Sequence, residues 1–392
     1  MFRKLPVIGH RIGLGDLFVA LFSRNAKSEF AQALRAFFNT PYVFLTNTGI
    51  ASFYLILLSL RKLSVKTEVI LPCYTAPSLV VAVKKAGLTP VLCDISLRDF
   101  NADLQDLLRR INPNTLCVVI VHMFGIPFNG ISGLKKNIPG DCFIIEDCAQ
   151  AFGSKIEGKA VGTFGDFNFC SFNRGKNLPT YDGGCAVTYD KKLALEFEAQ
   201  MLKFPAPSIG YRLGLVIKLF ALLFAFKPWC YGIFYFLIKY FKENTVPTDL
   251  QVTHTTSFQS GVGYALLKRS GDCFEKRFRN GLYLIGALRG IKGLVVLDIA
   301  ETLTPVFNRL PIIFEDEVEL EKACALLEKN GIESSQLYLK PLHHIFDLGY
   351  KEHEFPNAVY LAKHLLTLPV HPLVEAKDMD VMVKAIKDAV KD

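Results

Sequence analysis

One lysine lies in a polar turn directly after an apolar segment, residues 167–172, that predicts a strand. It is Lys176, within the segment Ser-Phe-Asn-Arg-Gly-Lys-Asn-Leu that begins at Ser171, and the pair Gly183-Gly184 follows it. An amine at the end of a strand can point into a cleft and form a covalent bond with a carbonyl group there. An ordinary solvent-exposed loop lysine has the same local sequence, because most lysines are exposed.

A carboxylate closes a second apolar segment, residues 143–147, whose sequence FIIED predicts a buried strand. Asp147 therefore falls at the carboxyl end of that strand, where ligands of open α/β sheets bind. A carboxylate there can hold a proton on the nitrogen of an aromatic ring. The alternative is that Asp147 caps a following helix, since aspartate is favoured at helix N-caps.

A third segment, residues 46–52, runs from a strand into an apolar helix predicted over residues 51–61. The N–H groups in the first turn of a helix have no partner within the helix, and they bind phosphate groups. Gly49 allows a ligand to approach the backbone closely. A glycine turn before a helix is common, so this segment indicates phosphate binding only in combination with the other two.

Together the three segments meet the requirements of an enzyme that uses pyridoxal 5'-phosphate (PLP). Such an enzyme needs a lysine that joins the cofactor, an acid facing its ring nitrogen, donors for its phosphate and a surface against its ring. The protonated ring accepts the electron pair that is released when the substrate Cα–H bond breaks. The order of the segments along the chain therefore predicts a PLP-dependent enzyme, and we predict no metal site.

Short β-branched segments alternate with amphipathic ones between residues 40 and 190, which is the pattern of βα units around a mainly parallel sheet. Parallel strands are covered on both faces, so they read as nearly continuous apolar runs. The predicted fold class is therefore α/β, with a mostly parallel sheet between helices. The expected strands are residues 69–72, 91–94, 117–122, 143–147, 167–172 and 185–189, and the expected helices include residues 51–61 and 104–110.

The chain of 392 residues is longer than one hydrophobic core usually serves, so two domains are expected. We predict a large PLP-binding domain over residues 1–255, with an apolar insertion at about 206–245. A smaller C-terminal α+β domain is predicted over residues 256–392. Its expected elements are helices over residues 259–269 and 317–329 and strands near residues 294–297 and 311–314.

The composition is that of a folded globular protein with a local apolar excess. Hydrophobic residues make up 51% of the chain and charged residues 21%, and the formal net charge is +8. Lysine and arginine are scattered and form no basic stripe, which argues against a nucleic-acid partner. The ten cysteines include no CxxC pair, and residues 1–15 show no secretory signal pattern, so we expect a cytoplasmic enzyme with reduced thiols.

Longer motifs in the chain resemble the DegT-type (DegT/StrS) sugar aminotransferase family within the fold-type I PLP-dependent enzymes. The similarity runs through TNTGIASF, EVILPCYTAPSLVVAVKKAGLTPVLCDI, FIIEDCAQAFG, SFNRGKNLPTYDGG, YLKPLHH and LTLPVHPLV, and so covers nearly the whole chain. The pair EDCAQAFG and SFNRGKNLPTYDGG is the most specific part, because it keeps residue type, spacing and order together. The resemblance implies the fold-type I architecture, a large PLP-binding domain with a smaller C-terminal α+β domain.

The resemblance assigns roles to residues of these motifs. It implies that Lys176 is catalytic, that it holds PLP covalently and that it moves a proton between substrate and cofactor. Asp147 would pair with the ring nitrogen, and Gln150 would lie near the ring hydroxyl. The phosphate would be held by Ser171 and by the backbone amides of Ile50 and Ala51.

The resemblance also implies a reaction. Family members move an amino group from glutamate or glutamine to a keto-sugar, usually nucleotide-linked, and they are usually homodimers. For this chain we expect a nucleotide- or lipid-linked keto-sugar. Relatives that dehydrate their sugar carry histidine at the position of Lys176, so amino transfer is favoured here. We expect a role in cell-surface polysaccharide or glycolipid biosynthesis. The alternatives are a PLP-dependent sugar dehydratase and a non-catalytic, membrane-associated relative.

Two positions depart from the family pattern. Where relatives place an aromatic residue that stacks on the cofactor ring, this chain has Ala76, and Tyr74 is the alternative candidate for that contact. The asparagine that relatives send from the partner subunit to the phosphate has no counterpart in residues 255–257. His343 and His344 match motifs of the family's small domain. They either face the active site or are half-buried residues whose imidazoles are hydrogen-bonded within the protein.

The third departure is a pair of apolar runs, residues 213–226 and 228–241, at a point where relatives have a short connection. A helix of fourteen residues reaches about 21 Å, short of a hydrocarbon core of roughly 30 Å, so neither run spans a membrane alone. Flanking cations favour a helical pair that lies in the membrane interface. These cations are Arg212, Lys218, Lys227, Lys239 and Lys242.

This interpretation predicts peripheral contact through residues 213–241 with the inner face of a membrane. The acceptor sugar would then be attached to, or destined for, a lipid carrier. Two alternatives stay open at this point: burial of the apolar runs against a dimer partner, and a hydrophobic lid over a lipid-bearing substrate.

Overall fold

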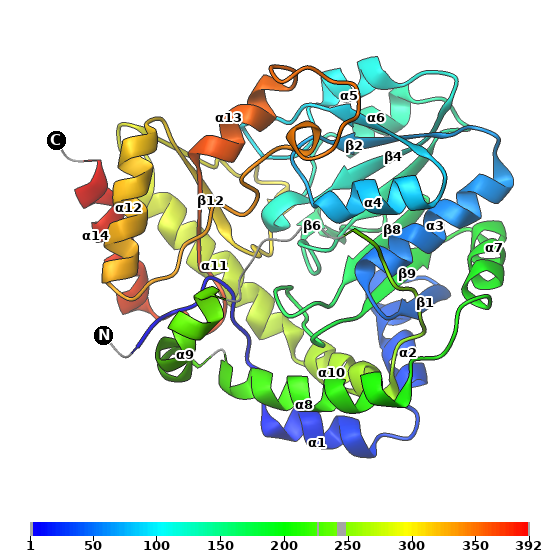
Figure 1. Cartoon of the computed structure of the whole chain (residues 1–392), viewed down its shortest axis with the longest axis horizontal. Helices are drawn as coiled ribbons and strands as arrows, with labels where there is room; N and C mark the ends of the chain where they lie inside the picture. Colours follow the sequence, from blue (N-terminus) through cyan, green and yellow to red (C-terminus); the bar gives the residue numbers. More distant parts are fainter. Residues whose placement is uncertain (1–2, 226, 241–247, 391–392) are drawn as a thin grey trace.

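The computed structural model describes residues 3–225, 227–240 and 248–390 (Figure 1). Within this part of the chain, a seven-stranded sheet forms the centre of the larger body. The strand order is β1-β9-β8-β5-β4-β2-β3, and only β9 runs against its neighbours, so the predicted α/β fold with a mostly parallel sheet is confirmed. The strands are β1 (Tyr42–Thr46), β2 (Glu68–Pro72), β3 (Thr89–Cys93), β4 (Thr115–Val121), β5 (Phe143–Asp147), β8 (Phe167–Ser171) and β9 (Gly184–Thr188).

The sheet is buried on both faces, because successive side chains of a strand point to opposite sides. In β4, Cys117 and Val119 contribute to one apolar core and Val118 and Ile120 to the other. The first face is covered by α3 (Gly49–Leu63), α4 (Pro77–Lys85) and α7 (Lys191–Met201). The second face is covered by α2 (Ala26–Phe38), α5 (Leu104–Arg110) and α6 (Ile131–Asn137).

A smaller α+β unit forms the other side of the molecule in Figure 1. Its antiparallel sheet has the order β10-β12-β13 and packs with helices from the last third of the chain. These elements are α11 (Ser270–Leu288), β10 (Leu294–Val296), β12 (Leu310–Phe314), α12 (Glu317–Lys329), α13 (Pro356–His364), β13 (Leu365–Leu368) and α14 (Ala376–Ala389). A third small sheet joins β11 (Leu303–Thr304) to β6 (Lys155–Ile156) and β7 (Lys159–Ala160).

The domain division at residue 255 stays a prediction, and the structure adds two contacts that cross it. Helix α10 (Ser257–Lys268) packs against α1 (Leu14–Phe22) and α2. Near the start of the chain, Leu5 pairs with Ile332, and the Leu5 N–H donates to the Gly331 carbonyl at 2.8 Å. The two parts of the chain are therefore linked at both of these points.

The two apolar runs form helices α8 (Ile209–Ala225) and α9 (Pro228–Tyr240), as the sequence predicts. No helix within the described ranges is long and apolar enough to cross a membrane. Helix α8 buries Leu215, Leu219 and Leu222, which share one helical face, in the core that it forms with α1. Residues 226, 241 and 242 lie outside the described residues, as does the side chain of Lys239.

Candidate active site

A cavity of about 240 Å³ opens at the carboxyl ends of β1, β5 and β8. Four of the residues predicted for the site, Lys176, Asp147, Ser171 and Ile50, line it together, although they come from three separate segments. The full lining is Thr48, Gly49, Ile50, Ala76, Ser78, Leu79, Asp147, Ala149, Phe169, Ser171, Asn173, Lys176, Asp182 and Gly183. The strand order brings these segments to one edge of the sheet, as expected for ligand sites in open α/β sheets.

Burial shifts the pKa values of Lys176 and Asp147 toward the neutral forms of both groups. The pKa of Lys176 is lowered to about 8, mainly by burial and further by the charge of Arg309, while Asp147 opposes the shift. The pKa of Asp147 is raised to about 6 by burial, opposed by a hydrogen bond from the Ala149 N–H at 2.9 Å and by the charges of Lys176 and His122. The cavity thus holds an amine and a carboxyl group that both titrate near neutrality.

The first turn of α3 forms one wall of the cavity. Thr48 caps this helix by accepting the Ala51 N–H at 3.1 Å, so the Ala51 amide already has a partner. Ile50 lines the cavity, and its N–H has no partner within the helix because it belongs to the first turn. Gly49 lies so close to β8 that a Cβ atom would come within 2.7 Å of the Ser171 Cβ. The glycine therefore allows the helix terminus and Ser171 to meet.

Gln150 is the predicted site residue that the structure keeps away from this lining. Its Oε1 accepts the Phe124 N–H at 3.2 Å, and its Nε2 donates to the Met123 sulfur at 3.4 Å. Ala76 does line the cavity, at the N-cap of α4. Tyr74, the alternative stacking residue, is buried, and its ring packs against Tyr338 with centroids 5.4 Å apart.

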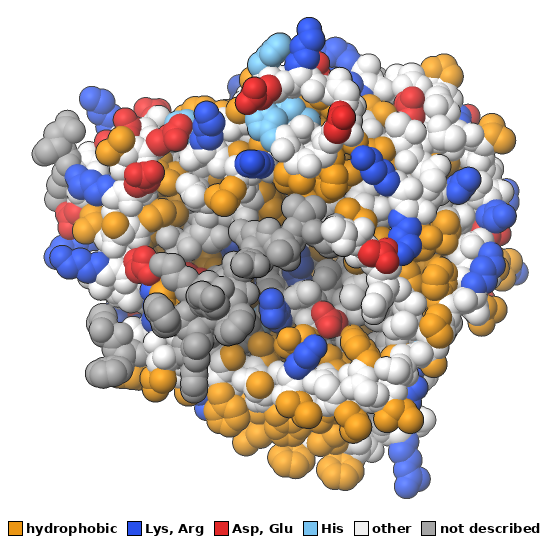
Figure 2. Space-filling view, in the orientation of Figure 1, with side chains coloured by type: hydrophobic (Ala, Val, Ile, Leu, Met, Phe, Trp, Pro, Cys, Tyr) orange, Lys and Arg blue, Asp and Glu red, His pale blue; other side chains and the backbone are white. Residues whose placement is uncertain are grey.

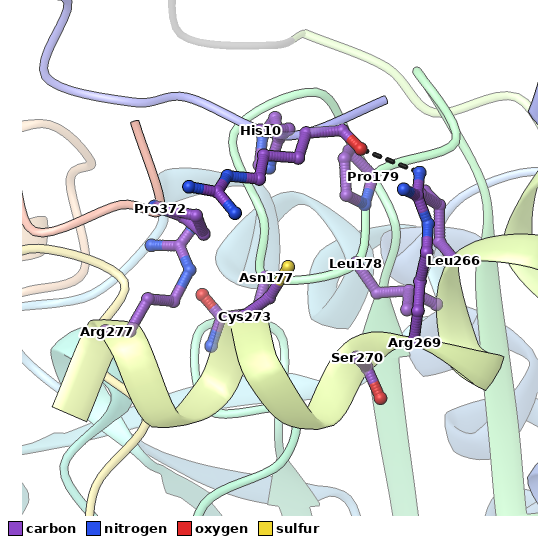
Figure 3. A pocket seen from close by; sticks show the side chains of 11 residues that line it. His10, Asn177, Leu178, Pro179, Leu266, Arg269, Ser270, Cys273, Arg277 and Pro372 are labelled. Carbon is purple, nitrogen blue, oxygen red and sulfur yellow. Dashed lines mark hydrogen bonds between the residues drawn. The ribbon is translucent and has the colours of Figure 1, made fainter. Parts of the chain in front are cut away.

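Hydrogen bonds from the N-terminal segment and from residues 306–308 hold the turn that carries Lys176. His10 Nε2 bonds to the Arg174 carbonyl at 2.6 Å, and Asn308 donates to the Gly175 carbonyl at 2.8 Å. Asn177 donates to the Val306 carbonyl at 2.9 Å. Figure 3 shows His10 and Asn177 around a cavity of about 20 Å³ behind this turn, room for about one water molecule.

Arg277 lies on the α11 side of this small cavity (Figure 3). The residue is 1% exposed, and its terminal nitrogens donate to the carbonyls of Phe307, Asn308 and Gly9 at 3.1 to 3.3 Å. These bonds tie the N-terminal segment to residues 307–308, which precede β12 and support the lysine turn. Sequence reasoning missed this support, because its members are far apart along the chain.

Glu146, directly before Asp147, holds the loop of residues 162–165 through hydrogen bonds. Its carboxylate accepts the N–H groups of Gly162, Phe164 and Gly165 at 2.6 to 2.7 Å, and it bonds to His122 Nε2 at 3.0 Å. Because the Phe128 N–H donates to His122 Nδ1, the proton of that imidazole lies on Nε2 and is donated to Glu146. His122 and Glu146 are fully buried, so they are structural residues.

The other histidine pair lies outside the cavity lining. His343 Nδ1 is 3.1 Å from the Cys73 sulfur, and its Nε2 contacts the Glu352 carbonyl at 3.2 Å. His344 bonds to the same carbonyl at 2.8 Å. His343 therefore connects this part of the chain to Cys73, directly after β2, and both imidazoles have hydrogen-bond partners outside the cavity lining.

The chain matches the model of the DegT/DnrJ/EryC1/StrS aminotransferase family over residues 21–205 and 251–387. Helices α8 and α9 fall in the unmatched stretch between these ranges. The chain is similar to the spore coat polysaccharide biosynthesis protein SpsC of Bacillus subtilis (strain 168), with 26% identity over 374 residues, 93% of this chain and 89% of that protein. GDP-perosamine synthase of Escherichia coli O157:H7 is 37% identical over 167 residues, 42% of this chain and 46% of that protein.

The structure is also similar to that of the putative sugar aminotransferase Spr1654 from Streptococcus pneumoniae, solved in a PLP form. The TM-score is 0.77 at 20% identity, and the similarity covers 98% of each chain. This likeness confirms the fold-type I architecture. The family match spans both parts of the molecule, so the resemblance inferred from the motifs is confirmed as well. The chain is an aminotransferase and belongs to the DegT/DnrJ/EryC1/StrS aminotransferase family.

Proposed function

We propose that this aminotransferase uses PLP to transfer an amino group from glutamate or glutamine to a keto-sugar. The observation that carries the proposal is the buried amine of Lys176, which shares its cavity with the carboxyl group of Asp147 and the first turn of α3. An amine, an acid and a helix N-terminus are the groups that PLP requires, so the residues of this cavity fit the cofactor.

Bound PLP would supply an electron sink for breaking the substrate Cα–H bond. Lys176 would hold the cofactor and move the substrate proton, and Asp147 would keep the ring nitrogen protonated. The Ser171 hydroxyl and the N–H of Ile50 would hold the phosphate. The Ala51 amide is shared with Thr48, and Gln150 bonds to Phe124, so contacts of these two residues with the cofactor stay predictions that require a local rearrangement.

The acceptor is proposed to be a keto-sugar, nucleotide- or lipid-linked. Proteins named GDP-perosamine synthase and spore coat polysaccharide biosynthesis protein SpsC are among the relatives, which supports a sugar acceptor and a role in cell-surface polysaccharide or glycolipid biosynthesis. Dehydration of the sugar is the second candidate. The lysine at position 176 favours amino transfer, since it offers an amine that holds the cofactor and shuttles protons.

A homodimer is proposed as the active form. Ala76 and Ser78 line the cavity where relatives place an aromatic residue, so a residue of a second copy is a candidate to cover the cofactor ring. A second copy of the chain placed over the cavity would shield it from solvent. Sedimentation velocity with and without PLP tests this proposal, and a monomer in both states would contradict it.

We also propose peripheral contact with the inner face of a membrane. Apolar side chains gather over α1 and α8, along the lower edge of the face drawn in Figure 2. Phe18 and Phe220 join the two helices with ring centroids 6.5 Å apart. We define the α1–α8 surface by its exposed members, Leu14, Phe18, Val19, Leu21, Phe22, Leu213, Ile217 and Phe224.

The charges beside the α1–α8 surface suit an anionic bilayer. No Asp or Glu occurs between Glu198 and Glu243, whereas Arg212, Lys218 and Lys227 lie along this stretch. Apolar side chains that are flanked by cations are typical of helices that lie in a membrane interface. The same surface on a cytoplasmic protein would place the enzyme next to lipid-linked acceptors.

The experiment for the catalytic proposal is a spectroscopic titration. The purified chain reconstituted with PLP is expected to be yellow, to lose that colour on addition of glutamate and to regain it with 2-oxoglutarate. Lys176→Ala is expected to give no such cycle. A wild-type protein whose spectrum does not respond to glutamate or glutamine would overturn the proposal, and a sugar product that has lost water without gaining an amino group would favour the dehydratase.

A further inference from the structure

The small cavity behind the lysine turn has a cationic lining (Figure 3). Three arginines contribute to this lining, Arg11, Arg269 and Arg277, and none of its described residues is an aspartate or a glutamate. Arg11 and Arg269 are exposed, whereas Arg277 is 1% exposed and projects from α11 into the protein. We call this space the Arg277 cavity, because its buried side is formed by that guanidinium.

Arg277 carries a buried charge that no acidic side chain neutralises in the described part of the chain. Burial lowers the pKa of Arg277 to about 10, so its guanidinium stays protonated at neutral pH. Its terminal nitrogens donate to backbone carbonyls, those of Gly9, Phe307 and Asn308. These carbonyl groups are neutral dipoles, so the positive charge on the buried side of the cavity has no counter-ion among the described residues.

The Nε atom of Arg277 adds an unused hydrogen-bond donor. It is buried and has no partner among the described residues, and the side chain that carries it lines the cavity. A buried donor without an acceptor is unfavourable, and so is a buried charge without an opposite charge. A water molecule in the cavity would satisfy the donor and leave the charge unpaired, whereas an anion would satisfy both.

The size of the Arg277 cavity selects among anions. Its volume of about 20 Å³ leaves room for about one water molecule. A phosphate, a carboxylate or a nucleotide has several heavy atoms and does not fit this space. Burial and the charge of Arg277 hold the pKa of His10, in the same lining, well below its ordinary value, so the imidazole is neutral. A monatomic anion beside the Arg277 guanidinium therefore matches both the volume and the charge.

We propose that the Arg277 cavity binds one chloride ion. The N–H of Arg277 Nε would donate to the ion, and the positive charges of Arg11 and Arg269 would attract it from the solvent side. The Arg277 cavity shares no lining residue with the cavity of Lys176. The proposal therefore goes beyond amino transfer and does not depend on PLP.

The bound ion would strengthen the support of the lysine turn. Arg277 donates to the Asn308 carbonyl at 3.2 Å, and the Asn308 amide donates to the Gly175 carbonyl at 2.8 Å, directly before Lys176. The lining of the cavity comes from segments far apart in the sequence, so the site exists only in the folded chain. A ligand that binds only the folded chain stabilises it increasingly as the ligand concentration rises above Kd.

The test compares chloride with gluconate, an anion too large for the cavity. The full chain is melted in sodium chloride and in sodium gluconate at equal ionic strength, up to about 150 mM. Chloride is expected to raise the melting temperature by about 2 °C relative to gluconate, with half-saturation at about 10 mM. Crystals soaked in sodium bromide are expected to show an anomalous scattering peak in contact with Arg277 Nε.

Cys273→Met tests the site without removing Arg277, whose bonds hold the fold. Cys273 lines the cavity from α11, so the longer side chain is expected to fill the space and to abolish the chloride-dependent shift. Cys324→Met is the matched control, because it makes the same change on α12, outside the lining, and it should keep the shift. Arg11→Gln is expected to raise the chloride concentration at half-saturation roughly 3- to 5-fold.

Equal melting temperatures in the two salts overturn the proposal, as does a chloride-dependent shift that Cys273→Met retains. A bromide peak in the cavity without a shift in about 150 mM chloride would identify an adventitious ion only, and would also overturn it. A shift with bromide peaks only at other positions would place the stabilising ion elsewhere and contradict the assignment. None of these readouts involves PLP or an amino donor, so their outcome is independent of the proposed function.

Discussion

The amine of Lys176 and the carboxyl group of Asp147 line one cavity, and the charge of each group stabilises the charged form of the other. Burial lowers the pKa of the amine to about 8 and raises that of the carboxyl group to about 6, and each residue counteracts the shift of the other. The cavity thus keeps an amine that loses its proton easily beside an acid that remains mostly ionised at pH 7.

The lowered pKa of Lys176 predicts the pH dependence of PLP capture. An amine attacks an aldehyde only when it is neutral, so the rate of colour formation by the cofactor-free chain should rise with pH. The midpoint is expected at about 8, in place of the ordinary 10.5. Stopped-flow absorbance between pH 6 and 10 measures it, with a lysine peptide in solution as control. A midpoint above 10 would mean that the amine is solvent-exposed.

Asp147→Asn is expected to retain PLP but to lose turnover by roughly 100-fold or more, because a neutral amide does not stabilise a charge on the ring nitrogen. The amide has nearly the same shape, and it removes a desolvated carboxylate, so the melting temperature should not fall. Single-turnover kinetics with glutamate, together with thermal melting, measure the two effects. Full activity of this variant would remove Asp147 from the mechanism.

Gly49→Ala should weaken PLP binding by roughly 10-fold, since the added Cβ would come within 2.7 Å of the Ser171 Cβ and 3.0 Å of the Cys170 carbonyl oxygen. Gly286→Ala is the matched control, because nothing lies within 4 Å of its added Cβ. In the last turn of α11, alanine is expected to be neutral or stabilising by about 0.5–1 kcal/mol. Fluorescence titration with PLP compares the two variants.

Glu146→Gln should destabilise the fold by about 2–5 kcal/mol, because one carboxylate accepts three backbone N–H groups and His122 in a fully buried position. Urea unfolding followed by circular dichroism measures the free energy. The exposed Glu198→Gln on α7 should change it by less than about 0.5 kcal/mol. Similar values for both variants would show that the buried bonds contribute little.

The α1–α8 surface should bind vesicles that contain anionic lipid. Phe22 and Ile217 are 79% and 70% exposed, so Phe22→Ser with Ile217→Ser removes apolar area without disturbing the core. The affinity in co-sedimentation is expected to fall roughly 10- to 100-fold. The control replaces two exposed residues elsewhere, Val65→Ser with Val318→Ser, and should bind like wild type.

Two other outcomes would contradict the membrane assignment. If the wild-type chain stays in the supernatant with anionic vesicles, the surface does not bind a bilayer. If the Phe22 and Ile217 substitutions change the sedimentation coefficient of the lipid-free protein to that of a monomer, the surface is a contact between two copies of the chain.

The chain sequence alone determined the parts of this protein that are local. The predicted strand 143–147 and helices 104–110 and 317–329 match β5, α5 and α12 residue for residue, because apolar periodicity and caps such as Asp103 and Asp316 are neighbours along the chain. Lys176 and Asp147 were found in the same way, since each follows an apolar strand, and parallel strands bring their carboxyl ends to one edge.

Tertiary structure decided what depends on residues far apart in the sequence. The side-chain amide of Gln150 is turned away from the cavity because it bonds to the Phe124 N–H and the Met123 sulfur. Asn308, which precedes β12, bonds to Gly175 in the lysine turn, and α1 joins α8 in one apolar surface although the two helices are far apart in the sequence. No local pattern encodes these contacts, because they arise from how the packed elements exclude or expose each side chain.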